Sequence, residues 1–197
     1  MTLWFTADQH FGHDSIRQYT QRPFDSVDEM DFEMIRRHNA VVQHGDTVYM
    51  LGDFTLSGGE RAARYLSLLR GEIMIIPGGH DAWAHKKRIY ISADHLAVQI
   101  LDPLVVLEVD DGCWLTLCHY PMRSWERSHY GMHHLHGHSH GAVGKFYSAY
   151  EHELAPGEFC GWAMDVGVDS NEFAPVSLES VIEQLNEVSH AETPSAV

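Results

Sequence analysis

The sequence is short of cysteine and of positive charge. Its three cysteines, Cys113, Cys118 and Cys160, include no CxxC pair, which disfavours a disulfide framework and a thiolate metal site. The 13 Lys and Arg residues face 28 Asp and Glu residues, for a formal net charge of −15. Such a charge repels a phosphate backbone, so we expect no extended nucleic-acid groove. A small phosphorylated substrate remains compatible if the site itself is positive.

Long apolar runs are also missing. No stretch approaches the ~20 apolar residues that cross a bilayer, and no basic region precedes residues 1–6, as it would in a secretory signal. The sequence therefore favours a cytoplasmic protein, in the host cytoplasm if phage-encoded, with no membrane partner. At 197 residues and 44% hydrophobic, a single domain over 1–189 with a frayed tail over 190–197 is expected. The oligomeric state is left open.

What is present is an alternation of apolar strands and amphipathic helices. The first half predicts strands at residues 3–7, 47–51 and 72–76 and helices at 27–42 and 60–70. The second half predicts a hairpin of residues 104–109 and 113–118, a strand at 162–168 and a helix from Ser177 to about Val188. These elements indicate an α/β sandwich built from two sheets.

Metal-type side chains recur at predicted strand ends. They are Asp8 with His10, Asp53, His80 with Asp81, His119, and His138 with His140. One such residue usually caps a turn or is solvated, but five strand ends with the same feature indicate a shared site. Imidazole and carboxylate suit Mn, Fe, Zn or Ni. Six ligands with one bridging carboxylate suit two ions ~3.5–4 Å apart.

The order of these motifs is distinctive. It runs D-x-H at 8–10, G-D at 52–53, G-x-H-D at 78–81, H-Y-P at 119–121 and G-H-x-H at 137–140. From residue 3 to about 180 the sequence resembles the calcineurin-like metallophosphoesterase superfamily, and in D-x-H-F-G-H it is similar to the compact single-domain bacterial and bacteriophage members. The resemblance implies a four-layer α/β/β/α sandwich of two mixed sheets flanked by helices.

The resemblance also implies roles for individual residues. Asp8, His10 and His140 would hold a first ion, Asp53 would bridge, and His119 and His138 would hold a second. The expected ions are Mn²⁺, with Fe, Zn or Ni as alternatives. A hydroxide shared by the ions would attack phosphorus, and His80 would be the general acid that protonates the leaving oxygen.

One position departs from the pattern. Gly79 stands where the family has an Asn ligand, so we expect weaker binding of the second ion. Asp81 is expected to orient His80 or cap its loop. For substrate binding, Arg123 and Arg22 lie in loops near the predicted site and are candidate anion-binding residues.

The substrate class stays open on sequence grounds. We expect a phosphodiesterase acting on small nucleotides, such as 2′,3′-cyclic nucleotides. The alternatives are a phosphomonoesterase, a dinucleoside-polyphosphate hydrolase, or a catalytically impaired metal-binding scaffold because of Gly79. The histidine-dense stretch 129–140 adds a metal buffer as a further hypothesis. Apart from His138 and His140, its histidines are interpreted as supporting or solvated residues.

Overall fold

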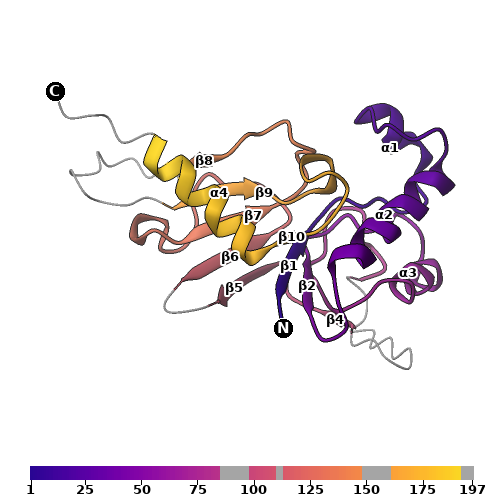
Figure 1. The fold of residues 1–197 in the computed structure, drawn as a ribbon, viewed down its shortest axis with the longest axis horizontal. Coiled ribbons are helices and arrows are strands. Elements are labelled where there is room, and N and C mark those ends of the chain that lie inside the picture. Colours follow the sequence, from indigo (N-terminus) through magenta and orange to yellow (C-terminus); the bar gives the residue numbers. More distant parts are fainter. Residues whose placement is uncertain (85–97, 110–112, 148–160, 192–197) are drawn as a thin grey trace.

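The computed structural model describes residues 1–84, 98–109, 113–147 and 161–191 (Figure 1). Within these ranges the strands form two five-stranded sheets. The first has the order β10 (Val176–Ser177), β1 (Leu3–Thr6), β2 (Thr47–Met50), β3 (Glu72–Ile75) and β4 (Val98–Ile100). Strands β1 to β4 are parallel, and β10 runs antiparallel to β1. Strands β1, β2 and β3 are the three strands predicted for the first half of the chain.

The second sheet is also mixed. Its order is β5 (Leu104–Glu108), β6 (Trp114–Cys118), β7 (His133–His136), β9 (Trp162–Asp165) and β8 (Phe146–Tyr147). Strands β6, β7 and β9 are parallel, while β5 and β8 are antiparallel to their neighbours. The expected α/β fold of two mixed sheets is therefore confirmed. The strand predicted at 162–168 is too long, because the chain leaves β9 after Asp165 and forms a 3₁₀ turn, η2, at Val168–Ser170.

The helices are α1 (Asp14–Tyr19), α2 (Val27–Val41), α3 (Gly59–Leu66) and α4 (Leu178–Ala191), with a second 3₁₀ turn, η1, at Ser128–Tyr130. At the start of α2, the Glu29 amide donates to Ser26 Oγ at 3.1 Å, and Glu29 Oε2 accepts from the Asp25 amide at 2.7 Å. Ser26 therefore caps the start of α2, and the Glu29 side chain accepts from the amide of Asp25.

Two predicted helix ends are wrong. Helix α3 ends at Leu66, before the expected Arg70, because Leu68 and Leu69 donate to the carbonyls three residues back. Helix α4 extends through Ala191, so residues 190 and 191 of the predicted tail are helical. Residues 192–197, the hairpin turn 110–112 and Cys160 lie outside the described residues.

Apolar clusters hold the layers together. Met30, Met34, Ala62 and Leu66 from α2 and α3 pack on the outer face of the first sheet, and Figure 1 shows these two helices on one side of the molecule. A second cluster fills the space between the sheets and includes the following residues: Phe5, Leu51, Ile76, Leu115, Leu117 and Leu135, with Val181 and Leu185 from α4. Among the described residues, no helix is both long and apolar enough to cross a membrane. Because this second cluster packs the two sheets against each other, it fixes the position of the loops that follow their parallel strands.

Candidate metal centre

The six predicted ligands come together at the carboxyl ends of the parallel strands. Asp8 and His10 follow β1, Asp53 follows β2, His119 follows β6, and His138 and His140 follow β7. They form two groups, Asp8 with His10 and His140, and Asp53 with His119 and His138. Within each group the ligand atoms all lie within 4.8 Å of one another. This edge of an α/β sheet is the usual place for a ligand site.

Asp53 lies between the two groups. Its Oδ2 is 3.6 Å from His10 Nε2 in the first group, and its Oδ1 is 3.4 Å from His119 Nε2 in the second. The two carboxylate oxygens of Asp53 therefore face different groups. This is the arrangement that a carboxylate shared by two ions requires.

Buried atoms without a hydrogen-bond partner indicate what the site holds. Among the described residues, Asp8 Oδ1, His10 Nε2 and His119 Nε2 are inaccessible to solvent and accept or donate no hydrogen bond. Leaving such groups unpaired is costly. All three belong to residues of the two groups, so the residues present fit divalent ions.

The imidazoles are oriented from their far side. His119 Nδ1 lies 2.8 Å from the Leu51 carbonyl, and His140 Nδ1 lies 2.7 Å from Asp169 Oδ2. A proton on each Nδ1 would make these contacts hydrogen bonds and leave Nε2 as the lone-pair donor. Such backing by carbonyl or carboxylate is typical of metal-binding histidines.

The backbone at the site is strained. Asp8, His10, Asp53, His138 and His140 have positive φ between 47° and 68°, a region that non-glycine residues seldom occupy. Five of the six predicted ligands therefore adopt an unfavourable conformation that the surrounding fold must impose. Strain of this kind clusters at functional sites, which supports a joint role for these residues.

Gly52 makes the close approach of these loops sterically feasible. Its φ is +85°, and a Cβ there would lie 2.5 Å from the Gly78 nitrogen and 2.8 Å from His119 Nδ1. A side chain at this position would therefore push apart the Asp53 loop and the His80 loop. The G-D pair of the sequence is explained by this contact.

Burial and charge shift the pKa values of the ligands. Burial raises the pKa of Asp8 to about 7, against the attraction of His140 and His119. Burial also lowers the pKa of His10 to about 3, with Asp53 opposing it. For Asp53, burial acts to raise the pKa, but His119 outweighs it and holds the pKa well below its ordinary value. The centre thus combines imidazole with carboxyl groups, a set of ligand types suited to divalent cations.

His80 lies at the mouth of the site. Its Nδ1 is 3.3 Å from Asp53 Oδ2 and 3.2 Å from His10 Nδ1, and its amide donates to Asp53 Oδ1 at 2.9 Å. Its side chain is 40% exposed, so it is accessible to a substrate. His13, which the sequence reasoning did not assign, joins His10 and His80 in a third group of potential ligands. The spacing in H-F-G-H was the available signal.

The two candidate anion-binding arginines differ in their surroundings. The Arg22 side chain is fully buried. It donates to Asp169 through two nitrogens and to the Asp8 and Gln9 carbonyls. The expectation that Arg22 contacts substrate is therefore corrected, because its donors are used within the fold. Arg123 is exposed, and its contact with substrate stays a prediction.

Asp81 and the histidines of β7 contact the backbone of neighbouring segments. Asp81 is fully buried and accepts from the amides of Gly78, Phe54 and Thr55, so it caps the loops. His134 and His136, which were expected to be supporting or solvated residues, are also fully buried, so they are not solvated. His134 Nδ1 lies 2.9 Å from the Thr116 carbonyl. His134 and His136 belong to strand β7. This strand was not predicted, because a run of histidines does not show the apolar pattern of a strand.

Sequence reasoning left Asp169 without a role. It links His140 to Arg22, and through Arg22 it reaches the Asp8 loop. Its bonds with both partners hold its pKa at about 2 although burial acts in the opposite direction. The D-x-G-x-D pattern at 165–169 was visible, but the distance to Arg22 along the chain hid the connection.

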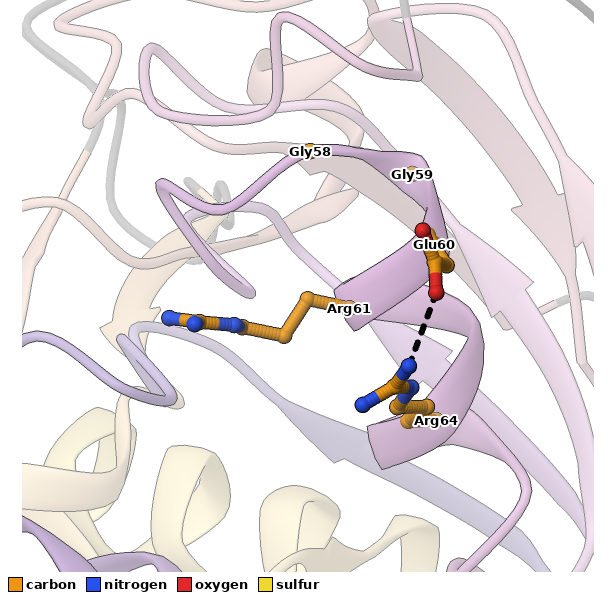
Figure 2. A pocket seen from close by; sticks show the side chains of 5 residues that line it. All are labelled: Gly58, Gly59, Glu60, Arg61 and Arg64. Carbon is orange, nitrogen blue, oxygen red and sulfur yellow. Dashed lines mark hydrogen bonds and ion pairs between the residues drawn. The ribbon is translucent and has the colours of Figure 1, made fainter.

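A separate surface pocket lies at the start of α3. It has a volume of about 430 Å³ and is lined by Gly58, Gly59, Glu60, Arg61 and Arg64. Figure 2 shows Arg61 pointing away from Arg64, which pairs with Glu60 at 2.8 Å. None of the six predicted ligands lines this pocket. Its opening is therefore distinct from the candidate metal centre.

Comparisons with known sequences give partial matches. No family model matches the chain. An uncharacterized protein of Methanocaldococcus jannaschii, MJ1445, is 42% identical over 89 residues, 44% of this chain and 51% of that protein. The Gene 66 protein of Mycobacterium phage L5 is 33% identical over 81 residues, 40% of this chain and 39% of that protein. The matches thus span about half or less of these curated relatives.

A solved structure aligns over most of the chain. AQ665 from Aquifex aeolicus, a protein of unknown function, gives a TM-score of 0.65 at 20% identity and covers 93% of this chain and 98% of that chain. This likeness shows the two-sheet α/β fold.

Proposed function

We propose that this protein is a phosphoesterase that uses two divalent ions, with Mn²⁺ as the first candidate. The proposal rests on the position of Asp53. One of its carboxylate oxygens lies near His10 of the first ligand group, and the other lies near His119 of the second. The partnerless atoms Asp8 Oδ1 and His10 Nε2 support it. Two ions held in this way supply Lewis acidity and lower the pKa of water toward neutrality.

The chain's own residues provide the remaining chemistry. Asp53 and His10 contact His80 Nδ1 and hold the ring in place, so Nε2 is the nitrogen left to face a substrate. From there, protonated His80 delivers its proton to the leaving oxygen. Arg123 is a candidate contact for a phosphoryl oxygen. Attack on phosphorus opposite the leaving oxygen requires no nucleophilic serine or cysteine.

A small phosphodiester is the favoured substrate, with 2′,3′-cyclic nucleotides as the first class to test. The protein's net charge of −15 disfavours a long polyanion. A strained cyclic diester also needs little assistance to its leaving group, which suits a site where Gly79 supplies no ligand. Phosphomonoesters and dinucleoside polyphosphates are the alternatives.

Hydrolysis of bis(p-nitrophenyl) phosphate with added Mn²⁺ tests the proposal. His80→Ala and Asp53→Ala should abolish turnover, whereas His44→Ala, at an exposed histidine outside the ligand groups, should leave it unchanged. A panel of 2′,3′-cyclic, 3′,5′-cyclic and linear nucleotides, assayed separately with Mn²⁺, Zn²⁺ and Mg²⁺, then ranks substrates. Equal activity in all three variants would contradict the assignment.

Gly79 motivates a second candidate function, a metal-binding scaffold without catalysis. That protein would bind its ions tightly but turn over no phosphate ester in the panel. Retention of His80 beside Asp53 favours the enzyme, because a scaffold has no need of an accessible proton donor there. Calorimetry and the ester panel together separate the two.

A further inference from the structure

Tyr120 packs against both histidines of the second ligand group. Its ring centroid lies 4.7 Å from that of His119 and 4.9 Å from that of His138, and both contacts are edge-to-face. With Asp53, these two histidines complete the second group. Tyr120 is the residue directly after His119, so the ligand-bearing loop itself holds this phenol at the group.

The Tyr120 hydroxyl lies beside Gly79, which has no side chain to offer as a ligand. A Cβ placed on Gly79 would lie 3.2 Å from the Tyr120 hydroxyl and 4.0 Å from Asp53 Oδ1. Gly79 is exposed, and its φ lies outside the left-handed region. Its backbone would therefore tolerate other residues, and the nearest obstacle to a side chain is the phenol oxygen. Within the described part of the chain, no hydrogen bond involves this hydroxyl.

We propose that the Tyr120 hydroxyl oxygen is a ligand of the second ion, in the position that a side chain at residue 79 would otherwise occupy. The proposal rests on the two-ion function above. Asp53, His119 and His138 supply three protein ligands, which leaves room for at least one more. A phenol oxygen beside a carboxylate and two imidazoles suits Mn²⁺ or Fe²⁺ better than a soft metal.

Titration calorimetry with Mn²⁺ on the metal-free full chain tests the assignment. Wild type should show two binding events. Tyr120→Phe keeps the ring packing but removes the oxygen, so affinity for the second ion should fall at least about tenfold, with the first ion unchanged. Tyr130→Phe, at a tyrosine that is 78% exposed, is the matched control and should bind both ions as wild type does.

Substitutions at Gly79 probe the same contact from the other side. Gly79→Ala should crowd the hydroxyl without adding a ligand, and should weaken the second ion as Tyr120→Phe does. Gly144→Ala, where a Cβ meets nothing within 4 Å, is its control. The double variant Tyr120→Phe with Gly79→Asn should restore the affinity for the second ion. The amide oxygen of the new asparagine can bind the ion, and removal of the Tyr120 hydroxyl leaves room for it.

Each contrary result has a distinct meaning. If wild type binds two ions and Tyr120→Phe binds them equally well, the Tyr120 ligand is overturned while the two-ion function stands. If Tyr120→Phe keeps its affinity for the second ion but has a raised KM for the ester substrate, the proposal is also overturned, because the hydroxyl then contacts the substrate and not the ion. If wild type binds fewer than two ions, the proposed function fails and this inference fails with it.

Discussion

The Arg22 guanidinium and the Asp169 carboxylate form a buried two-point ion pair. Nε to Oδ1 and the second nitrogen to Oδ2 are both 2.8 Å. The same guanidinium donates to the carbonyls of Asp8 and Gln9, and the same carboxylate contacts His140 Nδ1. Ligand-bearing loops from β1 and β7 are thereby joined through one charged pair.

Removing Arg22 should destabilise the protein strongly. Arg22→Ala removes the guanidinium that neutralises the buried Asp169 carboxylate, which keeps only its contact with His140, and it removes the donor to two buried carbonyls, so we expect a loss of about 3–5 kcal/mol of unfolding free energy. Arg36→Ala is the control, since Arg36 forms an exposed pair with Glu33 and should cost less than about 1 kcal/mol. Urea denaturation measures both. Equal effects would show that the buried pair contributes no more than a surface one.

Asp169 should control the first ion. In Asp169→Asn, the amide can donate to His140 Nδ1 and favour the wrong tautomer, so affinity for the first ion should fall about 10–100-fold. The second ion, held by residues that do not contact Asp169, should bind normally. Calorimetry with Mn²⁺ resolves the two events, and a loss confined to the second ion would refute the prediction.

Two glycines with similar φ should respond differently to alanine. Gly52 (+85°) is enclosed by Gly78 and His119, whereas a Cβ on Gly45 (+89°) meets nothing within 4 Å. Gly45→Ala should cost roughly 1–2 kcal/mol from the left-handed conformation alone. Gly52→Ala should cost more than about 4 kcal/mol and reduce Mn²⁺ binding. Thermal unfolding with and without Mn²⁺ provides the comparison.

His38 should make stability depend on pH. Burial lowers the pKa of His38 to about 4, although its contact with the Arg70 carbonyl opposes this. The unfolded chain, with its ordinary pKa near 6.5, takes up the proton first, so this contribution is complete above about pH 6.5 and is lost as pH falls toward 4. From this shift the loss is on the order of 3 kcal/mol.

His38→Gln separates this effect from other titrating groups. Its unfolding free energy, measured by urea denaturation of metal-free protein, should decline less than that of wild type between pH 6.5 and 4. Parallel pH profiles for the two proteins would show that His38 does not carry the dependence.

Chelation should lower the stability of wild type. Ions that bind only the folded state stabilise it, by about 2.7 kcal/mol at a concentration 100 times the Kd. Adding EDTA should therefore reduce the unfolding temperature of wild type. Asp53→Ala removes the shared carboxylate, so its unfolding temperature should change little with EDTA. An unfolding temperature of wild type that does not respond to Mn²⁺ or EDTA would argue against resident ions.

Local sequence patterns were enough to predict most of the fold. Strands β1, β2 and β3 and helix α2 follow from short-range periodicity and capping, which depend on neighbours a few residues apart. Strands β4, β7, β8 and β10 and the six-residue helix α1 escaped prediction because they are short, or because their residues lack an alternating apolar pattern. Within β7, His134 and His136 are buried and their ring nitrogens contact backbone carbonyls.

The sequence by itself determined which residues are candidates for the centre, because Asp8, Asp53 and His119 each follow a predicted strand. That strands of two different sheets bring these residues together is a result of the tertiary structure. The tertiary structure decided how they are held. Arg22 and Asp169 pair although they are 147 positions apart in the chain. The loop after β6, in the second sheet, brings the Tyr120 hydroxyl to Gly79, which lies in the loop after β3 of the first sheet. Contacts between loops from different strands leave no periodic mark in the sequence, so only the folded chain reveals them.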